Sequence, residues 1–206
     1  MTSRWFRSTA AHFASGVTVV TSIADDVPVG TTVNAFTTVS LDPALLLVSL
    51  RRGSRLLASV EESGVFAVTI LGADQRRHAS WFASPTRPTG VAAFAGIATR
   101  PAPRTGAPLL AEGVAYFDCR VHEVYPGGDH AIVLGEVVGC GELVPREPLM
   151  FLGRDFVTLG TTAPHCPAPA LASSALTSSS VLASSVASVG SGWSITASAA
   201  GVTTRR

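Results

Sequence analysis

Over the first 160 residues, apolar and polar positions follow the periods of helices and strands in turn. Ser3 is a plausible N-cap, and Gly16 is a natural stop for a helix. Between them, apolar and small residues recur at helical spacing at Trp5, Phe6, Thr9, Ala10, Phe13 and Ala14. The pattern predicts a helix at the N-terminus.

After Gly16 the chain changes to short extended segments bounded by turn residues. Asp25-Asp26 opens a turn, and Asp42-Pro43 breaks a long polar segment that starts near Val27. Pro126-Gly127-Gly128-Asp129 is the turn of a hairpin. The pattern predicts strands over residues 17–22, 27–41, 44–50, 65–71, 114–125, 130–140, 149–152 and 156–159.

Two further helices are predicted between these strands. Ser54 can cap a helix over residues 55–63, which Gly64 would end. Asp74 begins another, with Trp81 and Phe82 near its end. A loop rich in Pro, Gly and Ala follows, from Ser84 to about Gly113.

Within residues 114–125, polar and apolar side chains alternate, which predicts a strand with one buried and one exposed face. The exposed set would be Tyr116, Asp118, Arg120 and His122. Many strands, few short helices and tight turns indicate a mainly β fold: an antiparallel β-barrel with flanking helices.

Composition sets the boundary of this domain and its class. Residues 1–160 form one predicted domain, whereas residues 161–206 lack acidic side chains and are rich in Ser and Ala. We expect that segment to be a disordered, low-complexity tail. The net charge is +1 and all fifteen basic residues are Arg, so neither a nucleic-acid stripe nor a Schiff-base lysine is present.

Several classes of chemistry lack their motifs. The chain has no Rossmann glycine pattern, phosphate-binding P-loop, zinc-protease motif or serine-hydrolase elbow. Its three cysteines show no paired or metal-binding spacing, so no metal site is expected. The N-terminus lacks the apolar core of a signal peptide and no run is long enough to span a membrane, so we expect a cytoplasmic location.

The densest candidate for binding chemistry is an uncharged polar segment. Six residues within ten carry hydroxyl or amide groups: Thr31, Thr32, Asn34, Thr37, Thr38 and Ser40. Buried groups of this kind need partners, so the strand faces either solvent or a ligand. A flat ligand with many hydrogen-bonding atoms, such as a flavin, would suit it.

Two other clusters fit the same ligand. Ser49, Ser54 and Arg55 belong to a polar group at a strand end and a helix start, where a phosphate binds well. The alternative is that Ser54 is only a cap and the arginines form a solvated face. His130 follows a glycine turn that could overhang a pocket, or it is an incidental residue of a surface turn.

Taken in order, these segments resemble a known family. Thr32-Val-Asn-Ala-Phe-Thr-Thr-Val-Ser-Leu-Asp-Pro43 and Gly128-Asp-His130 are the most specific parts. Over about residues 4–160, the chain resembles the short-chain flavin reductases, which are reductase components of two-component flavin-dependent monooxygenases. The resemblance implies an FMN-binding split β-barrel with Greek-key topology, assembled as a homodimer.

The resemblance also implies the ligands and the residues that hold them. FMN or FAD would be reduced by NADH or NADPH, with His130 on the nicotinamide side as the catalytic position. The ring would lie against Thr32, Val33, Asn34 and Ala35, with Phe82 closing over it. The full set of expected cofactor-binding residues is Thr31, Thr32, Val33, Asn34, Ala35, Thr37, Thr38, Ser49, Ser54, Arg55 and Phe82.

The expected function is therefore that of an NAD(P)H:flavin oxidoreductase. A hydride would pass from nicotinamide C4 to flavin N5, and the reduced flavin would pass to a separate oxygenase. Two alternatives stay open: a flavoprotein that keeps FMN and acts directly on a small molecule, and a non-enzymatic carrier of flavin or haem.

Overall fold

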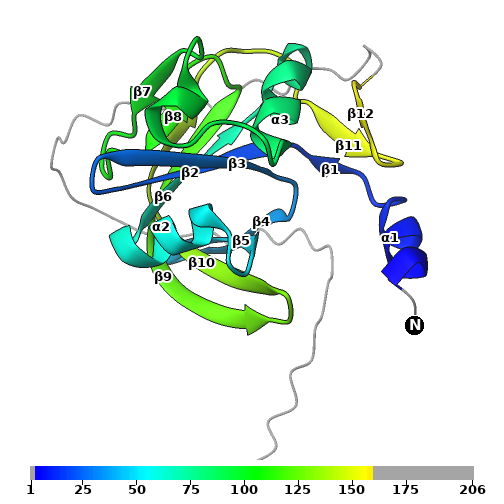
Figure 1. Cartoon of the computed structure of the whole chain (residues 1–206), viewed down its shortest axis with the longest axis horizontal. Helices are drawn as coiled ribbons and strands as arrows, with labels where there is room; N and C mark the ends of the chain where they lie inside the picture. The colour runs from blue at the N-terminus through cyan, green and yellow to red at the C-terminus, as the bar shows by residue number, and fades with distance from the viewer. Residues whose placement is uncertain (1–2, 160–206) are drawn as a thin grey trace, which may run out of the picture. The chain divides into compact units, whose positions relative to one another are not determined.

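The computed structural model describes residues 3–159, and a seven-stranded antiparallel sheet forms its centre (Figure 1). The strand order is β3-β2-β6-β9-β10-β5-β4. Their bounds are β2 Thr18–Ala24, β3 Val27–Val33, β4 Phe36–Leu41, β5 Ala44–Arg51, β6 Val65–Ile70, β9 Ala115–Gly127 and β10 His130–Glu142. The predicted strands are thus present, with ends that differ by a few residues.

The long polar segment predicted as one strand is two strands in the structure. β3 pairs with β2 and β4 pairs with β5, so the two lie at opposite edges of the sheet. Only Asn34 and Ala35 separate them. The physical reason is that the chain changes pairing partner at this point.

This short connection forces the sheet to close. Strands lie about 4.8 Å apart, so the edges of a flat seven-stranded sheet would be about 29 Å apart. The chain from Val33 to Phe36 can span only about 10 Å. The sheet therefore curls until its edge strands β3 and β4 come together at this connection. A hydrogen bond from Ser49 N to Ala35 O at 3.0 Å continues the β4–β5 pairing up to the connection. The predicted β-barrel is confirmed, and the two edges form its seam.

Hydrophobic side chains fill the barrel and attach one helix to its end. Phe66, Leu46 and Val133 are fully buried in the main core cluster. Helix α2, Arg55–Ser63, adds Leu56 and Val60 to that cluster. Its bounds match the prediction, because Ser54 accepts a hydrogen bond from Leu57 N and Gly64 adopts a left-handed φ of 68°.

Helix α3 covers the outer side of β3. It spans Arg76–Ala83 after a short 3-10 turn, η1 Ala73–Gln75. Phe82 is fully buried and packs on Phe94 with 5.2 Å between ring centroids. The segment predicted as a loop after α3 contains η2 Gly90–Phe94, β7 Thr99–Pro101 and β8 Pro108–Leu110.

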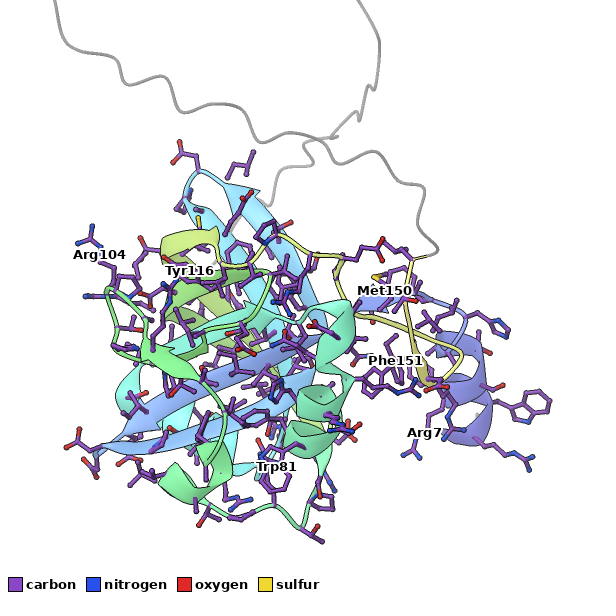
Figure 2. The ribbon with its side chains drawn as sticks, turned by 90° about the horizontal axis from the view of Figure 1, so that it is seen from above. Arg7, Trp81, Arg104, Tyr116, Met150 and Phe151 are labelled. Carbon is purple, nitrogen blue, oxygen red and sulfur yellow. The ribbon has the colours of Figure 1, made fainter. Side chains whose placement is uncertain are left out.

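The prediction for β9 is wrong at Asp118, which is fully buried. The segment before β8 folds over this strand, and Arg104 lies there at the edge of the molecule (Figure 2). Arg104 N donates to Asp118 Oδ2 at 2.7 Å, and the Thr105 hydroxyl donates to Oδ1 at 2.6 Å. The carboxylate is therefore covered by a segment distant in sequence and is satisfied by hydrogen bonds.

The two ends of the domain meet in a small sheet beside α3. β1 Ser15–Gly16 pairs with β11 Met150–Leu152, which pairs with β12 Asp155–Val157. Helix α1, Ser3–Ala10, precedes this sheet and is shorter than predicted. Trp5 is 71% exposed and Phe6 62% exposed, so the apolar side of α1 does not pack on the barrel.

Residues 160–206 lie outside the described residues, and so does the predicted low-complexity tail over residues 161–206. Its disorder and the domain boundary at residue 160 stay predictions.

Gly135 in β10 provides a test of core packing. A Cβ at this position would lie 2.3 Å from Cζ of Phe66, a fully buried ring. We predict that Gly135→Ala lowers the free energy of unfolding by about 1–3 kcal/mol, because the core must shift. Urea unfolding measures the change. Gly139→Ala is the control, since its Cβ would meet Asp118 at an ordinary 3.5 Å; equal stability of the two variants would contradict the packing.

Candidate functional site

Strand register gathers several of the predicted site residues at one end of the barrel. Ala35 at the seam is hydrogen-bonded to Ser49 in β5. Two residues further along β5, Arg51 pairs with His130 of β10. The β9–β10 turn is also tied to the start of α2, because Arg52 N donates to Asp129 O at 3.0 Å. The seam, the predicted histidine and the helix start are therefore neighbours.

Thr32 and Asn34 line a small pocket at the seam. The pocket has a volume of about 180 Å³ and is completed by Val17, Ala83, Phe151 and Phe156. Thr32 donates its hydroxyl proton to Ala79 O of α3 at 2.6 Å, whereas Asn34 is exposed and makes no side-chain hydrogen bond among the described residues. The amide of Asn34 is available to a ligand.

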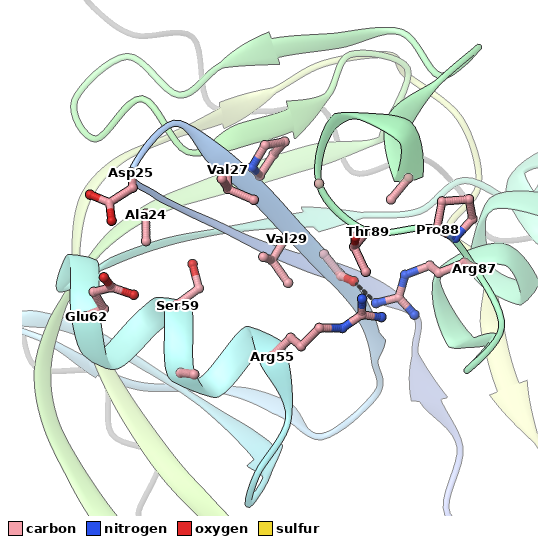
Figure 3. A pocket seen from close by; sticks show the side chains of 15 residues that line it. Ala24, Asp25, Val27, Val29, Arg55, Ser59, Glu62, Arg87, Pro88 and Thr89 are labelled. Carbon is pink, nitrogen blue, oxygen red and sulfur yellow. Dashed lines mark hydrogen bonds between the residues drawn. The ribbon is translucent and has the colours of Figure 1, made fainter.

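A second pocket lies between β3, α2 and the segment after α3 (Figure 3). Its volume is about 340 Å³. Arg55 from α2 and Arg87 from the segment after α3 project toward each other at one end. Arg87 donates to Thr31 Oγ1 at 2.9 Å and also to Gly30 O and Ser84 O.

The electrostatics of this arginine pair favour an anion. Within residues 3–159, neither Arg55 nor Arg87 forms an ion pair with a carboxylate. Burial lowers the pKa of Arg87, and the nearby charge of Arg55 lowers it further. Two guanidinium groups that repel each other would be stabilised by a phosphate, which accepts hydrogen bonds from both.

The start of α2 adds backbone donors to the same place. Ser54 caps the helix through a 3.2 Å hydrogen bond to Leu57 N, as the cap interpretation expected. Its hydroxyl is thus used by the fold, while the N–H groups of the first helical turn lie beside Arg55. Helix starts attract anions, so the cap and the phosphate interpretations are compatible.

His130 lies at the tip of the β9–β10 hairpin with a side chain 41% exposed. Its Nδ1 is 2.9 Å from Oδ1 of Asp129, and this hydrogen bond, with the charge of His130, lowers the pKa of Asp129. The pair can hold the imidazole in one orientation beside Arg51. Neither His130 nor Asp129 lines either of the two pockets.

Among the expected cofactor-binding residues, only Thr32, Asn34 and Arg55 line one of the two pockets. Val33 is 6% exposed and Phe82 fully buried, so both side chains belong to the core. The expectation that Phe82 closes over a cofactor stays a prediction. In this structure its ring packs against β3, and a Cβ at Gly30 would lie 3.1 Å from it and 3.2 Å from the ring of Phe94. Thr37 and Thr38 are exposed on β4 and line neither pocket.

Arg87 is a functional candidate that sequence analysis did not single out. It lies in Ser84-Pro-Thr-Arg-Pro88, a segment without periodicity. The available signal was a lone arginine between two prolines, which fix the local backbone. Arg87 becomes a candidate only in the folded chain, where β3 and α2 bring Thr31 and Arg55 beside it.

Within residues 3–159, no group of three or more His, Cys, Asp or Glu side chains could hold a metal ion. No helix in that range is long and apolar enough to cross a membrane.

Comparison with known proteins identifies the family. A NADH-dependent FAD reductase of Streptomyces globisporus is 39% identical over 150 residues, covering 73% of this chain and 82% of the relative. The reductase subunit HsaB of a flavin-dependent monooxygenase from Mycobacterium tuberculosis is 38% identical, covering 74% and 80%.

Among solved structures, the S. globisporus NADH:FAD oxidoreductase SgcE6 in complex with NAD and FAD fragments superposes with a TM-score of 0.73. It is 35% identical, and the match covers 79% of this chain and 96% of that one. Residues 10–160 also match the family described as the flavin reductase like domain. On these matches and on the barrel described above, the chain belongs to the flavin reductase-like domain family.

Proposed function

We propose that this chain is an NAD(P)H-dependent flavin reductase that supplies reduced FMN or FAD to a separate monooxygenase. The observation that carries the proposal is the arginine pair next to the hydroxyl-lined β3. Arg55 and Arg87 offer a phosphate site without competing carboxylates, and Thr31 to Asn34 offer hydrogen-bonding groups along the same strand. The relatives supply the activity: one reduces FAD with NADH, another serves a monooxygenase.

The donor set fits a flavin phosphate ester. From Gly30 on β3 to Asn34 just after it, the extended chain runs for about 13 Å, so an extended ligand can have its ring at the seam and its phosphate at the arginines. Asn34, Ala35 and Ser49 would border the ring through side-chain and backbone polar groups, with Thr32 beneath it. Arg55, Arg87 and the first turn of α2 would hold the phosphate.

A bound flavin would supply the redox chemistry, as the hydride acceptor for the nicotinamide. The residues of this chain bind the two ring systems, align them and limit access of water. His130, held by Asp129, would position the nicotinamide side of the site. No protein nucleophile is required.

We also propose that the protein is a homodimer. The outer faces of β5 and β10 carry half-buried apolar side chains at Leu45, Leu47, Ile132 and Leu134. Register places Leu47 opposite Leu134, so these residues form one continuous apolar strip. An apolar strip of this kind on the surface is suited to bind a second copy of the chain. The cytoplasmic location stays a prediction from the sequence.

Replacement of Arg55 tests the phosphate site. We predict that Arg55→Gln weakens FMN binding about 10- to 100-fold, because a charged hydrogen bond contributes about 1.5–3 kcal/mol. Riboflavin, which lacks the phosphate, should bind both proteins equally. Titration of flavin fluorescence measures both affinities. Arg52→Gln is the control, because Arg52 is exposed and lines a different pocket. An equal loss of riboflavin affinity would show that Arg55 does not act on the phosphate.

Replacement of His130 tests the positioning role. We predict that His130→Ala lowers turnover about tenfold or more, while the Kd for flavin stays close to that of the native chain, because misalignment affects hydride transfer rather than flavin binding. Steady-state NADH oxidation gives kcat and KM. His122→Ala, an exposed histidine on β9, is the matched control. If His130→Ala turns over at the native rate, His130 has no such role.

A charge on the apolar strip tests the dimer. We predict that Leu47→Glu shifts the protein from twice the monomer mass to the monomer mass in sedimentation velocity, since burying an unpaired carboxylate opposes association. Val91→Glu is the control. It adds the same charge to an apolar residue of η2 that is 74% exposed and does not belong to the strip, so it should leave the dimer intact. A native protein that sediments as a monomer would contradict the proposal.

A further inference from the structure

The outer face of helix α3 carries a groove that shares no lining residue with the two pockets of the proposed flavin site. Ala79 and Phe82, on the inner face, are fully buried, whereas Arg77, Ser80 and Trp81 are exposed. These three stand at positions i, i+3 and i+4, so they form one stripe on the helix. The groove has a volume of about 710 Å³ and is lined by Asp74, Arg76, Arg77, Ser80, Trp81 and Ser84.

Trp81 provides a flat apolar wall whose orientation is fixed. Its Nε1 donates a hydrogen bond to Ala93 O at 2.7 Å, which ties the indole to η2. The residue is nevertheless 37% exposed. The hydrogen bond satisfies the polar edge of the ring, but it leaves part of the ring uncovered at the groove. An aromatic surface held in this way is suited to stack on another flat ring.

Arg77 is the one charged side chain of the groove without an ion-pair partner in residues 3–159. Asp74 is paired with Arg146, at 2.5 Å between Oδ2 and Nη1, and Arg76 is paired with Asp155. The single carboxylate that lines the groove is thus already neutralised. Arg77 also lies in the first turn of α3, where the helix dipole disfavours a cation. Helix stability therefore does not explain this charge, and an anion would offset it.

We propose that this groove binds a small aromatic carboxylate, with its ring stacked on Trp81 and its carboxylate at Arg77. Residues four positions apart on a helix have Cβ atoms about 5–6 Å apart, a span that an anion of the size of benzoate bridges. A guanidinium donates two parallel hydrogen bonds to a carboxylate. Ser80, whose hydroxyl makes no hydrogen bond within residues 3–159, can donate a third. This site is additional to the proposed flavin site.

A titration of the full chain, labelled with ¹⁵N, with benzoate tests the site. A ligand with about nine non-hydrogen atoms in an open groove is expected to bind with a Kd of about 1 mM. We expect benzoate to shift the indole N–H signal of Trp81 and the backbone amide of Arg77. Loss of the indole signal in Trp81→Phe assigns it.

Two variants with the same change in charge locate the carboxylate. We expect Arg77→Gln to bind benzoate about tenfold more weakly or worse, because charged hydrogen bonds are lost. Arg104→Gln is the matched control and should bind like the native chain, since Arg104 is exposed and does not line the groove. Arg77 is also exposed, so neither substitution removes a core contact, and urea unfolding checks that both variants fold.

Benzamide, an uncharged ligand of the same shape, isolates the contribution of the charge. It should bind the native chain about tenfold more weakly than benzoate does, and the Arg77→Gln variant should bind both ligands with similar affinity. Saturation of the protein with FMN should leave the Kd for benzoate unchanged, because the groove shares no lining residue with the flavin pockets.

The inference is overturned if benzoate shifts neither signal, if Arg77→Gln binds benzoate as the native chain does, or if benzamide binds as tightly as benzoate. Displacement of benzoate by FMN would also overturn it, because the ligand would then occupy the flavin site. None of these results bears on the proposed function, which fails only if the native chain does not bind flavin or NAD(P)H does not reduce it.

Discussion

The two-residue connection between β3 and β4 is the constraint on which the rest of the structure depends. Because Asn34 and Ala35 join strands at opposite edges of the sheet, the sheet must curl into a barrel. The same closure leaves polar groups at the seam, next to β5 and the β9–β10 hairpin. The residues that close the fold are thus the residues that we propose to border the ring.

The chain has few charged residues, and the two arginines of the candidate phosphate site come from segments that are distant in sequence. The net charge is +1, yet Arg55 and Arg87 project toward each other without a carboxylate partner in residues 3–159. Keeping like charges together costs stability unless a ligand offsets it. Hydrogen bonds from the Arg87 guanidinium to the backbone oxygens of Gly30 and Ser84 hold this side chain in place, so the site is organised before any ligand arrives.

Local signals in the sequence predicted the elements well. The bounds of α2 follow from Ser54 and Gly64, and the β9–β10 hairpin follows from its glycine turn. The pattern of strands and turns predicted the β-barrel, and the family resemblance implied its split-barrel topology, whereas the break between β3 and β4 was not predicted. An error arose where distant segments meet: the segment before β8 covers β9 and buries Asp118, whose side chain the alternating pattern predicted to be exposed. Arg87 was missed for the same reason, because its partners are remote in sequence.

Mapping of the flavin site by amide NMR chemical shifts tests the central claim most directly. On addition of FMN to the native chain, the account predicts the largest shifts at the seam, over residues 31–35 and Ser49, and at Arg55 and Arg87. Residues around Asp118, on the covered face of β9, should stay unchanged. Absence of shifts at the seam, or shifts confined to another part of the barrel, would contradict the account.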